Sequence, residues 1–386
     1  MKLTRRQSLS FFGATSLFSL LPSSYLDAAI NSKYLILVEL QGANDGLNTV
    51  IPFSDRNYYK LRPTIGVPKK DILTISENVG LHFSLIGLAQ IFETGELKIV
   101  QNLGYPNPVL SHFRSIELWE TGGDGKAKGR NGWLNDSLNV IENQSILDGK
   151  AIYLDQSGDV FRGGLDGFYG PNSIGFAAAE LEARDQTVPI PETFGLLADL
   201  MQERKQNSEK LKQIQNKLSG ANRFSSIGRG NLGAQLSKVC NILSKGVNIP
   251  VLKVAIGSFD THSEQFWRHR DLLRELDESL YDTVQALQNI GIWNDTLIMT
   301  YSEFGRRATE NGSRGTDHGM AAPHFLMGGK IKGGFVGEVP NLGRLRNNNL
   351  EFEIDYRTLY ETVLREHFGL DNNPFENYQN KGLFSL

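Results

Sequence analysis

A strand–helix–strand pattern across residues 251–301 is the feature that most constrains the fold of this chain. Residues 251–256 and 296–301 are continuous apolar runs, which are typical of strands buried on both faces of a sheet. Between them, apolar residues recur at three- and four-residue steps over 266–290, which predicts one long amphipathic helix ending at Gly291. Short connections make this a βαβ crossover, so the two strands are expected to be parallel and close neighbours. The pattern predicts an α/β fold in which both strands end at the same edge of the sheet.

Acidic and imidazole side chains follow both strands. Asp260 and His262 come shortly after the first strand, and Glu303 comes shortly after the second. Ligands bind beyond the carboxyl ends of the strands in an open α/β sheet, so these three side chains are expected to share one crevice. A polar, Gly-rich loop brings three further candidates: Asp317, His318 and, in reserve, His324. Carboxylates together with imidazoles predict a divalent metal site, and the mixture leaves zinc, manganese, magnesium, calcium and iron open.

Other polar residues at predicted element ends are candidates for the same site. Asp45 follows an apolar run at residues 34–40, although Asn-Asp-Gly is also ordinary turn chemistry. Ser111 precedes a predicted helix, where a serine caps the helix or takes the place of a nucleophile that attacks an anion. His112 adjoins Ser111, which favours the functional interpretation. Arg306 either neutralises an anionic group such as phosphate or sulfate or forms a surface salt bridge.

The rest of the chain adds elements to the same sheet. Apolar runs predict further strands at 34–40, 97–101 and 151–154, and helical spacing predicts helices at 84–93 and 355–368. Residues 190–246 contain two more predicted helices, the first with a charged, lysine-rich solvated stretch. We interpret 190–246 as a helical excursion from the sheet and not as a separate domain.

The first 29 residues are typical of a twin-arginine export signal. Arg5 and Arg6 precede a weakly apolar run at 9–21, and Ala28-Ala29 offers a cleavage region. The apolar run is shorter than the about 20 residues that a membrane span needs. An amphipathic first helix and an uncleaved membrane anchor are the alternatives. We expect the twin-arginine export machinery as a partner, and a periplasmic or extracellular mature protein that does not span a membrane.

Charge and cysteine content exclude several classes of protein. The net charge is −3 and no basic block is long enough to follow a phosphate backbone, which argues against nucleic acid as the main partner. Cys240 is the only cysteine, so neither a disulfide within the chain nor a cysteine-based zinc site can form.

Five stretches of the sequence carry a resemblance to a known family. They are Arg5-Arg6, 41–53, 105–115, 258–265 and 301–334. With these stretches the chain resembles the exported bacterial family called domain of unknown function 1501, which in turn resembles the alkaline phosphatase, sulfatase and phosphoglycerate mutase superfamily. The resemblance implies one alkaline phosphatase-like domain over residues 30–386, with three α/β/α layers and a mostly parallel central sheet.

The same resemblance assigns roles to individual residues. It implies that Asp45 is the metal aspartate after the first strand, that Ser111 stands at the nucleophile position, and that Asp260 and His318 are metal ligands. The chain departs from the superfamily pattern at two positions: Glu264 stands where a histidine is common, and Phe304 replaces the histidine of an Asp-His pair. One metal, a rearranged pair of metals and no metal are all compatible with these departures.

These observations lead to two functional expectations. The first is an exported, metal-dependent hydrolase of phosphate or sulfate esters, with an anionic ester as its substrate. Its predicted catalytic residues are Ser111, His112 and Arg306. Its predicted metal ligands are Asp45, Asp260, His262, Glu303, Asp317 and His318. The alternative is a non-catalytic binding or assembly protein that keeps the fold with a degraded site.

Overall fold

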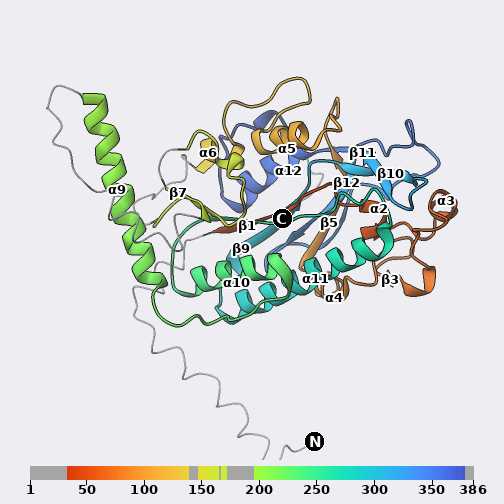
Figure 1. Ribbon diagram of the computed structural model, residues 1–386, viewed down its shortest axis with the longest axis horizontal. Coiled ribbons are helices and arrows are strands. Elements are labelled where there is room, and N and C mark those ends of the chain that lie inside the picture. Colours follow the sequence, from red (N-terminus) through yellow and green to blue (C-terminus); the bar gives the residue numbers. More distant parts are fainter. Residues whose placement is uncertain (1–32, 139–146, 165–166, 172–194, 379–386) are drawn as a thin grey trace, which may run out of the picture. The chain divides into compact units, whose positions relative to one another are not determined.

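A mostly parallel sheet forms the centre of the structure, which is a computed structural model (Figure 1). Residues 33–138, 147–164, 167–171 and 195–378 are described, with only the backbone described for 195–206. In these residues, nine strands pair in the order β13-β5-β12-β9-β1-β8-β6-β7, with β14 also paired to β5. Their bounds are β1 (Tyr34–Leu40), β5 (Leu97–Gly104), β6 (Ala151–Tyr153), β7 (Phe168–Tyr169), β8 (Val251–Ile256), β9 (Thr296–Tyr301), β12 (Ala322–Met327), β13 (Gly334–Val336) and β14 (Ile354–Asp355). Every pair is parallel except those that β12 makes with β5 and β9.

Helices cover both faces of the sheet, which gives the three layers expected (Figure 1). One layer contains α4 (Ile86–Glu93), α10 (Gly230–Ser244) and α11 (Gln265–Asn289). The other contains α5 (His112–Thr121), α6 (Trp133–Leu138) and α12 (Tyr356–Thr362). Because side chains alternate along a strand, Ile36 and Val38 of β1 pack in the first apolar core and Leu35 and Leu37 in the second. The expected α/β class with a mostly parallel central sheet is confirmed.

The βαβ unit differs from the expectation in one respect. β8, α11 and β9 span the predicted residues, and Gly291 follows the helix with a φ of +81°. β8 and β9 are parallel in direction, but they are not adjacent, because β1 lies between them and pairs with both. A long amphipathic helix gives no information about how many strands its crossover passes over. The carboxyl ends of β1, β8 and β9 therefore meet at one edge of the sheet.

The segment expected to be a Gly-rich loop is an antiparallel hairpin instead. β10 (Gly305–Glu310) pairs with β11 (Thr316–Gly319), with Arg306 opposite His318. The sequence of the hairpin is polar and lacks the apolar alternation that identifies a strand. The buried side chain of Arg306, on β10, stabilises the hairpin by donating to the carbonyl oxygen of Thr316 on β11. A second small sheet contains β2 (Val50–Ile51), β3 (Leu73–Thr74) and β4 (Gly80–Leu81).

The remaining described elements are short or lie at the periphery of the fold. They are α2 (Gly46–Thr49), α3 (Arg56–Leu61), α9 (Gly195–Leu218), a π-helical turn (Val363–His367) that continues α12, and 3₁₀ turns at Lys69–Asp71, Asp159–Phe161, Trp293–Asp295 and Glu376–Tyr378. Of the predicted excursion at 190–246, α10 buries its apolar face against α11 and β8. The predicted export signal and its cleavage region lie outside the described residues. Among the described helices, none is long and apolar enough to cross a bilayer.

Candidate metal centre

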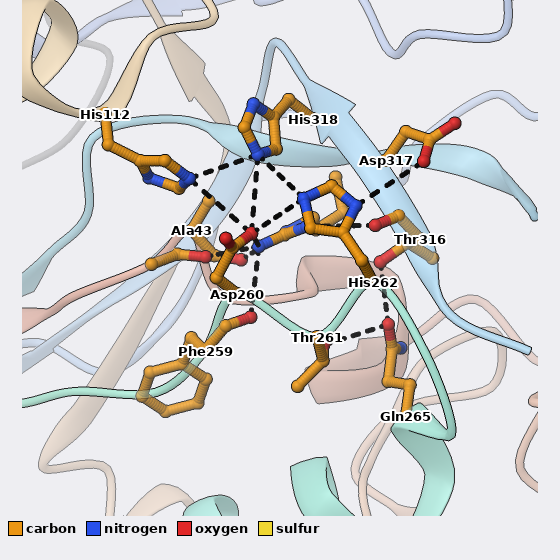
Figure 2. A network of polar contacts seen from close by, with 12 residues as sticks. Ala43, His112, Phe259, Asp260, Thr261, His262, Gln265, Thr316, Asp317 and His318 are labelled. Carbon is orange, nitrogen blue, oxygen red and sulfur yellow. Dashed lines mark hydrogen bonds and ion pairs between the residues drawn. The ribbon is translucent and has the colours of Figure 1, made fainter. Parts of the chain in front are cut away.

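Three histidines and one aspartate converge beyond the carboxyl ends of the strands (Figure 2). His112 is the first residue of α5, Asp260 and His262 lie in the loop after β8, and His318 lies on β11. The Nε2 atom of His318 is 3.1 Å from the Nε2 atoms of both His112 and His262. Asp260 Oδ1 lies 2.9 Å, 3.3 Å and 3.5 Å from the Nε2 atoms of His262, His318 and His112. We call these four side chains the His₃Asp group.

The other ring nitrogen of each histidine faces an oxygen atom. His318 Nδ1 lies 2.9 Å from the carbonyl oxygen of Leu110, and His112 Nδ1 lies 2.6 Å from Glu303 Oε1. His262 Nδ1 lies 3.5 Å from Asp317 Oδ1. A carbonyl oxygen only accepts hydrogen bonds, so the proton of neutral His318 belongs on Nδ1. By the same reasoning, the carboxylates of Glu303 and Asp317 favour protons on Nδ1 of neutral His112 and His262. The Nε2 atoms then carry the free lone pairs, as in histidines that bind metals.

The separations within the His₃Asp group fit a metal ion. Bonds of about 2.0–2.1 Å in a tetrahedral zinc site place its ligand atoms about 3.3 Å apart. His318 Nε2 and Asp260 Oδ1 lie 2.9–3.5 Å from each other and from the Nε2 atoms of His112 and His262. Lone pairs that face one another at such distances repel unless a proton or a cation lies between them. Among the described residues, His112, Asp260 and His318 form a group whose ligand atoms all lie close enough together to hold one metal ion, and His262 lies beside this group.

Local contacts set the charge of these side chains. The hydrogen bond to Glu303 raises the pKa of His112, whereas burial lowers the pKa of His318. Burial acts to raise the pKa of Asp260, but the hydrogen bond and charge of Arg306 more than offset it, and the pKa is lowered. Asp260 is thus ionised and His318 neutral at neutral pH, which are the states that bind a metal.

Arg306 lies beneath the group and holds its loops together. Its side chain is fully buried and forms a salt bridge with the half-exposed Asp260, so the salt bridge considered from the sequence forms, but its arginine is in the interior and not at the surface. It donates hydrogen bonds to the carbonyl oxygens of Ala43, Gly42, Phe259 and Thr316, and to Asp260 Oδ1 at 2.5 Å. These acceptors engage every nitrogen of the guanidinium. The contacts favour a positioning role for Arg306 over direct binding of an anionic substrate.

Asp45 is held apart from the His₃Asp group by contacts of its own. It is completely buried, and Arg62 donates to its Oδ2 at 2.5 Å and to its Oδ1 at 2.9 Å. Gln265 donates to Oδ2 as well. Burial acts to raise the pKa of Asp45, but the charge and hydrogen bonds of Arg62 outweigh it and lower the pKa. No motif in the sequence marks Arg62, and its role appears only in the folded chain.

The other predicted site residues surround the group. Glu303 Oε1 also accepts the backbone N–H of Gly42 at 2.9 Å, and Glu303 Oε2 accepts from Ser302 at 2.9 Å, so both oxygens are engaged. Asp317 is half-exposed and faces His262. Ser111 is the exposed N-cap residue of α5, and its hydroxyl makes no hydrogen bond within the described part of the chain.

His324, the reserve candidate, is remote from this environment. It is buried on β12 with its ring centroid 5.5 Å from that of Trp119, and burial lowers its pKa to about 3. The structure thus brings together His112, Asp260, His262 and His318, places Glu303 and Asp317 behind two of the histidines, and leaves Asp45 with Arg62. His112 was expected from sequence to be catalytic, and here its Nε2 lies among the candidate ligands.

Comparison with known proteins identifies the family. A family model described as "Protein of unknown function (DUF1501)" matches residues 180–385, more than half of the chain, and the protein belongs to this family. No protein with a curated description matches the sequence.

Several solved structures are similar to this chain. A protein in the alkaline phosphatase superfamily from Vibrio parahaemolyticus shows 12% identity and a TM-score of 0.38, with 81% of this chain and 64% of that chain covered. The PsFucS1 sulfatase from Pseudoalteromonas sp. shows 11% identity, a TM-score of 0.37, and coverage of 83% and 70%. The C-terminal periplasmic domain of EcEptC from Escherichia coli, in complex with Zn, shows 9% identity, a TM-score of 0.36, and coverage of 78% and 74%. This chain spans less than two thirds of the length of the Vibrio protein.

Proposed function

We propose that the protein is an exported, metal-dependent hydrolase of phosphate or sulfate esters. The convergence of His112 Nε2, His318 Nε2 and Asp260 Oδ1, which lie 3.1–3.5 Å apart with His262 Nε2 next to the last two, is the observation that carries the proposal. The site is open to ligands, since the side chains of Asp260 and His262 are each 44% exposed. The twin-arginine-like pattern predicted at residues 1–29 supports the exported location.

The donor set favours zinc among the metals left open by the sequence. Three imidazoles and one carboxylate suit a borderline ion, whereas calcium and magnesium prefer oxygen ligands. His112, Asp260 and His318 would hold the ion, with His262 as a further candidate ligand. A bound divalent metal would supply Lewis-acid polarisation of the ester and stabilise the charge that develops on it.

The protein's own residues would position the ester and its attacking group. Ser111 is the candidate nucleophile, because its exposed hydroxyl directly precedes His112 and has no partner among the described residues. Glu303 fixes the ring of His112 by accepting its Nδ1–H. Arg306 holds Asp260 and the backbone of both flanking loops in place. Asp45 belongs to the supporting structure in this proposal, because Arg62 already neutralises it.

Metal analysis of the purified protein, together with ester hydrolysis, tests this function. We expect about one equivalent of zinc per chain and hydrolysis of p-nitrophenyl phosphate or sulfate. His318→Ala should lose both the metal and the activity. His367→Gln is the matched control, because His367 bonds to the carbonyl oxygen of Tyr34, away from the His₃Asp group. Less than a tenth of an equivalent of any divalent metal, with none taken up on addition, would contradict the proposal.

A non-catalytic binding or assembly protein is the second candidate. It is favoured by the engagement of Asp45 with Arg62 and of Arg306 with backbone carbonyls, which leaves neither residue free for a substrate. Asp260→Asn separates the two functions. If the variant folds but no longer hydrolyses an ester that the wild type cleaves, the hydrolase is supported. If the wild type itself binds metal but cleaves no phosphate or sulfate ester, the binding protein is supported.

A further inference from the structure

A pocket of about 420 Å³ lies next to the loop that carries His262. Its walls come from three segments: the loop after α3, the start of α11 and the turn between β10 and β11. The lining residues that matter most are Pro63, Pro68, Glu264, Phe266, Trp267 and Arg314. The volume is in the range of small-molecule sites, and the combination of aromatic, proline and charged walls is typical of a binding pocket.

Trp267 is the most unusual residue of this pocket. Its side chain is 60% exposed, whereas Trp119, Trp133 and Trp293 are 1%, 3% and 4% exposed. An exposed indole offers a large, rigid apolar face next to a polar N–H, which suits stacking against a ligand or partner. The guanidinium of Arg270 lies 4.5 Å from the ring centroid. Trp267 is therefore supported on one side and presents the rest of its surface to solvent.

The walls of the pocket are fixed in advance of any ligand. The carboxylate of Glu310 accepts the backbone N–H groups of Thr64 and Ile65, both at 2.9 Å. The backbone N–H of Glu264 donates to Ser313 at 3.0 Å, which ties the start of α11 to the hairpin turn. Preformed walls reduce the entropy that binding must overcome. The pocket is thus built to receive a ligand without reorganisation.

An exposed ion pair supplies the polar part of the lining. Arg314 Nη2 lies 2.5 Å from Glu264 Oε1, and the two side chains are 64% and 65% exposed. A wholly apolar ligand would remove water from this pair without replacing its hydrogen bonds. A saccharide ring would stack its C–H face on Trp267 and offer hydroxyls to Glu264 and Arg314. The lining therefore favours a saccharide over an apolar molecule.

The pocket adjoins the His₃Asp group through the backbone. Glu264 follows His262 by two residues, so their Cα atoms are at most about 7 Å apart. The hairpin is tied to the same loop, because Thr316 N donates to Thr261 O at 3.2 Å. A ligand that fills the pocket would thus contact Glu264, two residues along the chain from His262.

We propose that this pocket is a saccharide-binding subsite, and that the saccharide carries the ester that the His₃Asp group acts on. The second half of this statement rests on the proposed hydrolase function, whereas saccharide binding itself does not. Trp267 is the stacking residue, and Glu264 and Arg314 recognise the hydroxyl groups. The substrate class is then a phosphorylated or sulfated saccharide.

Binding of the full chain to an array of neutral, phosphorylated and sulfated mono- to tetrasaccharides tests the subsite. We expect at least one saccharide class to bind the wild type, Trp267→Ala to weaken binding about tenfold or more, and Trp267→Phe to retain most of it. Phe335→Ala is the matched control, because Phe335 is another exposed aromatic residue, on β13. The bound saccharide should also protect the fluorescence of Trp267 from quenching by acrylamide, since the other tryptophans are buried.

The outcomes separate the subsite from the hydrolase. No binding to any saccharide on the array, or binding that Trp267→Ala leaves unchanged, would overturn the subsite even if p-nitrophenyl esters are hydrolysed. Saccharide binding that depends on Trp267, in a protein that hydrolyses no ester, would support the subsite and overturn only the hydrolase.

Discussion

At the scale of single residues, Asp45 and Arg62 form a buried ion pair. Both side chains are completely buried, and Arg62 also donates to Asn48 at 2.8 Å. Arg62→Met would leave a buried carboxylate without its counter-charge, and we expect it to lower the free energy of unfolding by about 3–5 kcal/mol. Urea denaturation measures the change. Arg346→Met, at a 72% exposed side chain, should have no such effect. If adding Asp45→Asn to Arg62→Met restores none of the loss, the charge argument is wrong.

Glu120 makes a second residue-scale prediction, on the dependence of stability on pH. It lies in a buried group in which Lys253 Nζ is 3.7 Å from Glu120 Oε1 and donates to Glu39 at 2.8 Å. Burial raises the pKa of Glu120 from 4.5 to about 8. Between these values the folded state keeps a proton that the unfolded state releases, so the unfolding free energy falls as pH rises through this window.

Glu120→Gln should remove this contribution and flatten the decline of the unfolding free energy between about pH 5 and 8. Denaturant unfolding at a series of pH values measures it. Glu117→Gln is the control, because a hydrogen bond from Lys128 helps to lower the pKa of Glu117 to about 2 and Glu117 stays ionised throughout the window. An unchanged slope in Glu120→Gln would show that Glu120 is already ionised in the folded protein.

Residue types and their order along the chain predicted part of the site and missed the rest for a physical reason. Asp260, His262 and His318 could be assigned to one site because each follows or precedes a recognisable strand. The binding partner of Asp45 could not be predicted from the sequence, because either a buried arginine or a metal ion can neutralise a buried carboxylate. The sequence around Arg62 carries no sign of which cation is used.

At the scale of elements, apolar runs predicted the strands closely and polar strands were missed. β1, β8 and β9 have the predicted bounds because strands buried on both faces need continuous apolar residues. The hairpin β10–β11 carries two arginines, two threonines, a glutamate, an aspartate and a histidine, and the buried Arg306 side chain of β10 donates to the carbonyl oxygen of Thr316 on β11. Sequence periodicity cannot report such contacts.

A substitution at Gly42 tests how the loop after β1 supports the His₃Asp group. Its φ is +102°, and a Cβ at this position would lie 2.5 Å from the backbone nitrogen of Asp260. Gly42→Ala should displace Asp260 and weaken zinc binding by about tenfold or more, as changes behind metal ligands do. Chelator competition measures the affinity. Gly257→Ala is the matched control, because its nearest contact would be an ordinary 3.5 Å. Equal zinc affinity in both variants would show that the position of Asp260 does not affect zinc binding.

At the scale of the whole molecule, the His₃Asp group exists only when distant parts of the chain are folded together. His112 and His318 are 206 residues apart in sequence, and their Nε2 atoms are 3.1 Å apart in the structure. An unfolded chain does not present these ligands together, so a metal that binds the group binds the folded state far more strongly. Metal binding and global stability are therefore linked.

This linkage gives a prediction that needs no substrate. Zinc at about one hundred times its dissociation constant should raise the free energy of unfolding by about 2.7 kcal/mol, and a chelator should reverse the rise. Denaturant unfolding with zinc and with chelator measures the difference. Asp260→Asn should remove most of it, because the remaining imidazoles lose the charge that balances the cation, whereas Asp271→Asn should keep it, since the exposed Asp271 pairs with Arg270 on α11. A rise of equal size in Asp260→Asn would mean that zinc stabilises the protein from another site.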